Sequence, residues 1–288
     1  MLEAIGFGLV TAAVVALAAV GLSLQVSVTN FINFAYGDFM TFGAYSAYAA
    51  NSAGLNFFAA VVVGGVATAL LGVLANLAVF RPFVRRKARV ITLLISTIGL
   101  SFIVQNAIVI IWGTGAERYT VSIGNAHRVG PFLWTTGDLV IMGTAFVLLF
   151  GLHLMLRYTR FGKSLRATSN NPELALASGI DTGRVVNYTW LIAGFFAAVA
   201  GVALAMELNT LRPVLGFNEL FVVFGAIILG GIGRPYGAML GALIIGILTE
   251  VSGAYLNPAY KGSIAFAVVV ILLLVRPQGL LAAKGKSA

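Results

Sequence analysis

The chain contains no cysteine and very little charge. Only 9% of its 288 residues are charged, whereas a soluble domain carries about a quarter. The missing cysteines exclude disulfides and thiolate metal sites. Apolar residues make up 60% of the chain, and the mean hydropathy is +1.00. Because this composition is arranged in long uncharged stretches, the sequence predicts a polytopic membrane protein built from helices.

Catalytic and metal-binding patterns are also missing. The two histidines, His127 and His153, are far apart in sequence and have no carboxylates at metal-ligand spacing. Gly162-Lys163-Ser164 ends like a phosphate-binding loop, but the position of its first glycine is held by Arg157. No Ser/His/Asp set or paired intramembrane carboxylates appear, so we expect no catalysis, metal or nucleotide site in this chain.

The uncharged stretches predict an all-α helical bundle of about 8–9 spans that forms a single transmembrane domain over residues 1–288. The predicted spans lie near residues 5–28, 32–50, 56–79, 90–112, 138–156, 185–206, 218–233, 237–255 and 261–275. The segment Phe31–Ala50 follows a turn that no charge fixes, so it is either a span or a broken or re-entrant segment. The last three spans are short for a hydrocarbon core of ~30 Å. Short, glycine-interrupted spans of this kind are typical of a translocation pathway.

The net charge of +9 is concentrated in a few segments between the spans. These are Arg81–Arg89, Arg157–Arg184, Arg234 and the tail from Arg276 onward. The positive-inside rule predicts that they lie in the cytoplasm together with the C-terminus, close to anionic lipid. Basic residues are not interleaved with aromatic residues, so we expect no nucleic-acid partner.

A polar, basic loop at residues 157–184 separates two long apolar spans and contains a short predicted helix. Asn171 suits the N-cap, Pro172 the first helical position and Gly179 the left-handed position after the last turn. A two-turn helix outside the bilayer with both ends capped indicates that a partner docks there. Leu174, Ala175 and Ser178 are expected to share the face that enters a groove on the partner.

Asp38 is the only charged residue within the first two predicted spans after Glu3. An ionisable group in a span usually faces the bundle interior and has a function. Asn30, Asn33 and Tyr36 are polar neighbours, and with Asp38 they form the candidate translocation pathway. The alternative is that this segment lies at the cytoplasmic interface, where Asp38 is solvated.

A group of glycines near the C-terminal end has the spacing of close helix packing. Its members are Gly230, Gly231, Gly233, Gly237 and Gly241. Small residues four positions apart allow two helix backbones to approach closely. Helix packing is the preferred interpretation, and direct contact with a substrate is the alternative.

Short segments spread over nearly the whole chain closely resemble the permease subunits of branched-chain amino-acid ABC importers, in particular the shorter, LivH-like member of a permease pair. In family order they are Ile32-Asn33-Phe34-Ala35-Tyr36-Gly37-Asp38, Arg81-Pro82, Ile95-Ser96-Thr97-Ile98-Gly99, Arg160-Phe161-Gly162-Lys163-Ser164-Leu165-Arg166-Ala167, Gly179-Ile180-Asp181, Gly230-Gly231-Ile232-Gly233 with Pro235 and Gly237-Ala238, and Pro277 with Gly279-Leu280. Two positions depart from the family pattern: Tyr36 replaces a frequent histidine and Asp38 a frequent glutamate.

The resemblance implies an ABC-importer permease fold in the bacterial inner membrane. It also implies cytoplasmic ATPase subunits that hold MgATP, a second permease subunit and a periplasmic solute-binding protein, while this chain holds no cofactor. Residues 157–184 would be the cytoplasmic coupling loop, seated in the ATPase groove. The coupling residues implied are Asn171, Glu173, Leu174, Ala175, Ser178, Gly179 and Ile180. The cargo would be branched-chain amino acids or a related small amino acid or amide.

A stand-alone channel or a gradient-driven secondary transporter for a small polar solute remains the alternative. Such a protein would use Asp38 and the broken spans directly. Proton and ion relays usually need chains of acidic residues or histidines, and this chain has few such residues inside its spans. A membrane-embedded enzyme ranks last because no acid/base pair is present.

Overall fold

The structure is a computed structural model that describes residues 2–119, 124–255, 267 and 270. Within these residues, six helices are long and apolar enough to cross a membrane. They are Glu3–Thr29, Phe57–Arg85, Val90–Trp112, Thr136–Tyr158, Thr182–Glu207 and Pro235–Tyr255. The prediction of an all-α membrane bundle is confirmed, but the count of about 8–9 spans is not. Except for residues 267 and 270, the predicted span at 261–275 lies outside the described residues.

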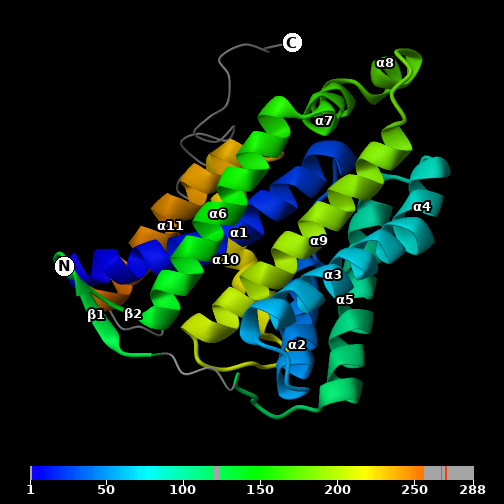
Figure 1. Cartoon of the computed structure of the whole chain (residues 1–288). Coiled ribbons are helices and arrows are strands. Elements are labelled where there is room, and N and C mark those ends of the chain that lie inside the picture. The colour runs from blue at the N-terminus through cyan, green and yellow to red at the C-terminus, as the bar shows by residue number, and fades with distance from the viewer. Residues whose placement is uncertain (1, 120–123, 256–266, 268–269, 271–288) are drawn as a thin grey trace.

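The elements follow one another along the chain in the order shown in Figure 1. They are α1 (Leu2–Thr29), α2 (Tyr36–Ser52), α3 (Phe57–Ala75), the π-helical turn η1 (Asn76–Phe80), α4 (Arg81–Arg85), α5 (Val90–Trp112), β1 (Ala126–Val129), β2 (Phe132–Thr135), α6 (Thr136–Tyr158), α7 (Arg160–Asn170), α8 (Pro172–Ala177), α9 (Thr182–Glu207), α10 (Leu215–Gly230) and α11 (Pro235–Tyr255).

The centre of the bundle is formed by α1 and α9, which run antiparallel (Figure 1). α1 packs mainly against α11 and α9, and α9 packs in addition against α2 and α3. The buried face of α9 consists largely of alanine, valine and glycine. At Gly201, a side chain would collide with the backbone of Met40 in α2. In a bilayer, helices associate through such close contacts because lipid tails are as apolar as the helix surfaces.

Two of the central helices end in the same way. Asn30 follows α1 with φ 56°, and Asn209 lies just beyond α9 with φ 47°. Asparagine tolerates this left-handed conformation better than other residues with a side chain. In each case an irregular segment follows, and a helix too short to count among the six spans comes next: α2 after Asn30, α10 after Asn209. The chain therefore contains two interrupted segments of similar construction.

The first turns of these two short helices, α2 and α10, meet inside the bundle. A side chain at Gly37 would collide with the carbonyl group of Gly216, and one at Gly216 with that of Gly37. The backbone amide of Gly216 donates a hydrogen bond of 3.0 Å to the hydroxyl of Thr41. Only pairs of residues without side chains allow the two backbones to lie this close.

The interruptions correct two predicted spans. The span predicted at 32–50 is helical only from Tyr36, because Asn33 Oδ1 accepts a hydrogen bond from the amide of Ala35 and holds a tight turn there. The helix observed in this stretch, α2, therefore runs from Tyr36 to Ser52 and is too short to count among the six spans. The span predicted at 218–233 begins at Leu215 and ends at Gly230, since Gly231 has φ 103°.

A two-stranded hairpin, β1–β2, was not expected from the sequence. It stands at the end of the bundle where α1 begins, opposite α4, α7 and α8 (Figure 1). Trp134 Nε1 donates a hydrogen bond of 3.0 Å to the carbonyl oxygen of Gly6 in α1. Thr135 and Asp138 then form a reciprocal capping box that starts α6. The hairpin ties the loop before α6 to the start of the chain.

Candidate functional site

The segment between α6 and α9, predicted as a polar loop with one short helix, folds into two helices, α7 and α8. Thr159 ends α6 and accepts a hydrogen bond of 3.2 Å from the amide of Gly162, which caps α7. Arg166 of α7 donates a hydrogen bond of 2.5 Å to the carbonyl oxygen of Leu156. These contacts hold α7 against the end of α6, and α7 in turn carries α8.

The short helix predicted at residues 171–179 is present as α8, with both predicted caps. Asn171 Oδ1 accepts a hydrogen bond of 2.9 Å from the amide of Leu174. At the other end, Gly179 has φ 83°, and the amide of Ile180 donates to the carbonyl oxygen of Ala175 at 3.0 Å. A glycine in this conformation with this backbone bond is the Schellman motif. The helix ends are therefore fixed by the sequence itself.

The exposed face of α8 differs from the predicted one. Ala175 is only 4% exposed, so its side chain points toward the rest of the protein and is not available to a partner. Leu174 and Leu176 are 63% and 62% exposed. Glu173 and Ser178 are exposed as well. The surface that α8 offers is thus formed around two large apolar side chains, one of which the sequence analysis did not select.

Ile180 and Ala175 attach α8 to the bundle. Ile180 is partly buried and packs against the hydrophobic core. Directly after it, Asp181 Oδ1 accepts a hydrogen bond of 3.0 Å from the amide of Arg184 and caps α9. Only the short stretch that contains Gly179 separates α8 from α9. A displacement of α8 would therefore act on the central helix α9 without a long flexible link.

The candidate pathway residues lie at the first interruption. Asn33, Tyr36 and Asp38 are fully buried, whereas Asn30 is exposed. Tyr36 donates a hydrogen bond of 3.1 Å to the carbonyl oxygen of Ala193 in α9. The structure thus brings the three buried residues into the contacts between central helices.

Asp38 is buried between α2 and α5, not solvated at an interface. Its Oδ2 accepts a hydrogen bond from the hydroxyl of Ser101 in α5. Its Oδ1 has no hydrogen-bond partner among the described residues. A buried carboxylate with one unpaired oxygen is costly, which makes this contact sensitive to any movement of α5 against α2. The sequence analysis did not identify Ser101, because nothing in its local pattern shows that it faces α2.

The glycines near the C-terminal end lie at helix contacts. A side chain at Gly237 would collide with the carbonyl group of Gly230, and one at Gly241 with that of Ala226. α10 and α11 therefore pack backbone to backbone along this line. Gly231 and Gly233 lie in the turn between the helices, with φ 103° and 74°.

A second polar pair, Asn76 and Asn187, joins the π-helical turn after α3 to α9. Asn76 Nδ2 donates a hydrogen bond of 2.8 Å to Asn187 Oδ1. A π-helical turn adds a residue to the helix and re-aims its side chains. This turn leads into α4 at the same end of the bundle as α7 and α8 (Figure 1). The sequence analysis missed this pair because the two residues are far apart in the chain.

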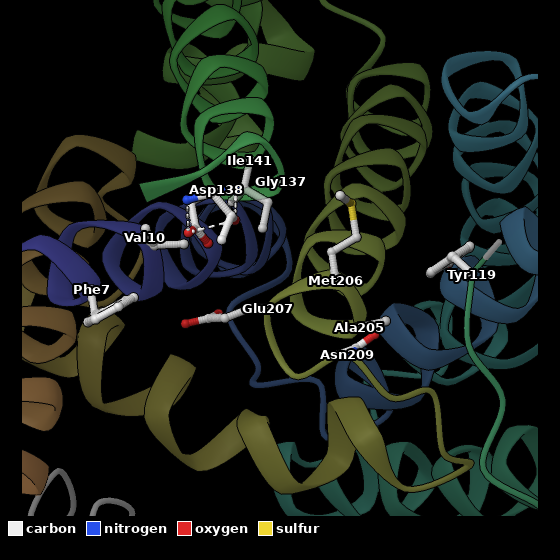
Figure 2. Close-up of a pocket in the computed structure, with 11 residues that line it drawn as sticks. Phe7, Val10, Tyr119, Gly137, Asp138, Ile141, Ala205, Met206, Glu207 and Asn209 are labelled. Carbon is white, nitrogen blue, oxygen red and sulfur yellow. Dashed lines mark hydrogen bonds between the residues drawn. The ribbon is translucent and has the colours of Figure 1, made fainter. Parts of the chain in front are cut away.

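A pocket of about 220 Å³ opens at the opposite end, between α1, α6 and α9. Figure 2 shows Glu207 from α9 and Asp138 from α6 at this pocket, with Phe7 and Val10 from α1. Both carboxylates already have partners in the protein. Glu207 accepts a hydrogen bond of 2.5 Å from Thr11, and Asp138 belongs to the capping box of α6. The acids at this pocket thus have structural contacts.

Tyr119, which also lines this pocket, fastens the loop after α5 to α2. Burial raises the pKa of the Tyr119 hydroxyl far above its ordinary value. The hydroxyl therefore stays protonated and donates a hydrogen bond of 2.8 Å to the carbonyl oxygen of Ala44. Among the described residues, no group of three or more His, Cys, Asp or Glu side chains is placed to hold a metal ion.

The architecture is that of a polytopic helical membrane protein, in which the short helices α2 and α10 meet inside the bundle and a capped helix projects at one end. A sequence model of the family described as "Branched-chain amino acid transport system / permease component" matches residues 4–273. The chain belongs to this family.

Three relatives show how much of the chain the similarity covers. The high-affinity branched-chain amino acid transport system permease protein LivH of Escherichia coli strain K12 is 34% identical over 281 residues, which cover 92% of this chain and 90% of the relative. The corresponding protein BraD of Pseudomonas aeruginosa is 30% identical, and the match covers 95% of this chain and 93% of the relative. A probable LivH of Methanocaldococcus jannaschii is 30% identical, and the match covers 92% of this chain and 87% of the relative. The similarity thus extends over nearly the whole chain.

Proposed function

We propose that this chain is a membrane-spanning permease subunit of an ATP-driven importer for branched-chain amino acids. The observation that carries the proposal is the family match over residues 4–273 together with the exposed, doubly capped helix α8. The chain supplies the path through the membrane as one permease domain. ATP, with Mg²⁺, would be bound and hydrolysed by separate subunits, and a periplasmic binding protein would deliver the amino acid.

The orientation in the membrane follows from the basic residues. α4, α7 and α8 lie at one end of the bundle (Figure 1). The basic residues at this end include Arg81, Arg85, Arg160, Lys163 and Arg166. We infer from the positive-inside rule that this end is cytoplasmic. The hairpin β1–β2 and the start of α1 then face the periplasm.

Coupling would run from the ATPase through α8 into α9. Leu174 and Leu176 are large apolar groups in a segment that projects from the bundle, a pattern typical of helix-in-groove docking. The ATPase subunit would shift α8 when ATP binds. Since Gly179 leaves only a short link to α9, the shift would rotate α9 against α2 and α10 and so change access at the interruptions. The energy comes from the different contacts of the ATPase with the two states.

The second permease subunit is expected to lie against α5. This helix exposes Asn106, and the one partner of its Nδ2 among the described residues is the carbonyl oxygen of Phe102, one turn away on the same helix. Gly99 lies on the same side and has open space around it. Lipid tails cannot satisfy the rest of an amide group, whereas a partner helix can approach at a glycine and bond to an asparagine.

Substrate identity rests on the relatives. The start of α2 differs from the usual family pattern at two positions, Tyr36 and Asp38. A related small amino acid or amide is therefore the second cargo to test. Uptake of radiolabelled leucine, isoleucine and valine into proteoliposomes, compared with small amides, would decide between these cargoes. The assay needs the complete transporter, with ATPases, second permease and binding protein.

Replacement of Gly179 tests the coupling route. Valine is strained at φ 83° and should reduce ATP-coupled uptake by roughly tenfold. Asparagine tolerates this conformation, so Gly179→Asn should keep most of the uptake. Wild-type coupling in Gly179→Val would contradict the route through α8. Solute flux through the chain reconstituted alone would contradict the proposed function as a whole.

A further inference from the structure

A second, larger pocket lies where α6, α7 and the start of α9 meet, and its volume is about 590 Å³. One wall is the end of α6 with the first turns of α7. The other wall is the link after α8 with the first turns of α9. The two walls touch where Phe161 of α7 packs edge-on against Tyr188 of α9, with ring centroids 6.2 Å apart. The pocket therefore lies between α7 and α9, the two helices that precede and follow α8 in the chain.

Polarity changes along the pocket in the same direction on both walls. On α9 the lining begins with Asp181 and Arg184 and ends with Ile192. Ile192 lies about 16 Å from Asp181 along the helix axis. On the other wall, Arg160 stands at the start of α7, and Met155 lies one turn earlier, inside α6. The charged end therefore lies level with the ends of the spans, and the apolar end lies within them.

The polar end offers several groups that have no partner in the described part of the protein. Arg160 makes neither a hydrogen bond nor an ion pair with any described residue, and the same is true of the hydroxyls of Ser164 and Tyr188. Arg184 differs, because its Nε lies 2.9 Å from Asp181 Oδ2. At this end the pocket is thus lined by one guanidinium and two hydroxyls that have no partner among the described residues. At its other end the lining is apolar.

We propose that this pocket binds one anionic phospholipid of the cytoplasmic leaflet. The guanidinium of Arg160 would pair with the phosphate, and the hydroxyls would complete its hydrogen bonds. The upper part of an acyl chain would lie along Met155 and Ile192, at the apolar end of the pocket. The depth assigned to the pocket rests on the proposed function, through the orientation of the permease. The match of charge at one end and apolar surface at the other is what distinguishes a lipid from a free anion or a soluble partner.

A lipid bound there would influence coupling. Its headgroup would contact α7 on one side and the link between α8 and α9 on the other, where Gly179 and Ile180 line the pocket. The lipid would thus fill the space into which α8 and its link would have to move. Occupancy is expected to stiffen the connection between the ATPase-docking helix and α9.

Lipid binding to the full chain tests the proposal directly. The chain, purified in detergent, is titrated with phosphatidylglycerol or with phosphatidylcholine of the same acyl chains, and bound lipid is counted by native mass spectrometry. We expect phosphatidylglycerol to bind more tightly. Arg160→Gln should weaken this binding about fivefold, as expected for one basic residue at a membrane surface. Arg160→Lys should keep most of it.

Arg157→Gln is the matched control, because it removes the same charge one turn away, outside the pocket lining. Equal losses in the Arg157 and Arg160 variants would show diffuse attraction to a basic surface and overturn the proposal. Equal affinity for the two lipids would overturn it as well. Ile192→Ser should also weaken binding, and if it does not, or if glycerol phosphate competes as well as the lipid, the site is one for a free anion. Because binding is measured and not transport, the outcome is independent of the proposed function.

Discussion

Ser101 of α5 donates a hydrogen bond to the buried carboxylate of Asp38 in α2. This bond links the first interrupted segment to a helix that otherwise exposes most of its surface. Few other contacts hold α5 to the bundle, and its main neighbour is α2. Among the described residues, the Asp38–Ser101 pair is the side-chain hydrogen bond that joins α5 to another helix.

Removal of this hydroxyl should destabilise the chain. Ser101→Ala would leave Asp38 without its described side-chain partner, at a cost of about 1–3 kcal/mol. The measurement is the free energy of unfolding of the purified chain in detergent. Ser96→Ala is the control on the same helix, since the partner of the Ser96 hydroxyl in the described part of the chain is the carbonyl oxygen of Thr92, within α5 itself. Equal destabilisation by the two changes would show that the bond to Asp38 is not special.

The contact between the two interruptions should not tolerate a methyl group. Gly216→Ala would place a side chain against the carbonyl group of Gly37 and should cost about 1–3 kcal/mol. Gly99→Ala is the matched control, because a side chain at Gly99 meets no atom within 4 Å. The measurement is the free energy of unfolding of both variants, purified in detergent. If Gly216→Ala unfolds like the wild type, α2 and α10 do not meet as described.

Docking of the ATPase should depend on the two exposed leucines of α8. Leu174→Ala and Leu176→Ala are each expected to weaken association with the ATPase subunits about fivefold, the effect of losing roughly 1 kcal/mol at an interface. The affinity is measured with purified subunits in nanodiscs. Leu208→Ala is the control, because Leu208 is also exposed but lies at the opposite end, directly after α9. An unchanged affinity of both α8 variants would place the docking surface elsewhere.

Pairing with the second permease should depend on Asn106. Asn106→Leu removes the exposed amide of α5 and is expected to weaken the permease pair about threefold, in line with a typical interhelical hydrogen bond in a membrane. The stability of the purified chain alone should not change. Val147→Leu, on the exposed face of α6, serves as the comparison. Tighter pairing in Asn106→Leu, or no effect on pairing, would mean that lipid and not a permease covers α5.

The sequence by itself determined those features that depend on local chemistry. The apolar stretches specify the long helices, since backbone groups in lipid must be satisfied within each helix. Asn171, Pro172 and Gly179 fix both ends of α8, because caps act on atoms within one turn of the chain. The family motifs are short runs of neighbouring residues spread over the chain, and they were sufficient to indicate the transport class.

Only the tertiary structure decided which residues face one another. The partner of Asp38, the meeting of Gly37 with Gly216, and the inward turn of Ala175 depend on helices far apart in the sequence. A hydrophobic pattern shows no inner and outer face in a membrane helix, because lipid and protein interior are equally apolar. The sides of these helices are set by close packing and by the few polar groups that must find partners, and both are properties of the assembled bundle.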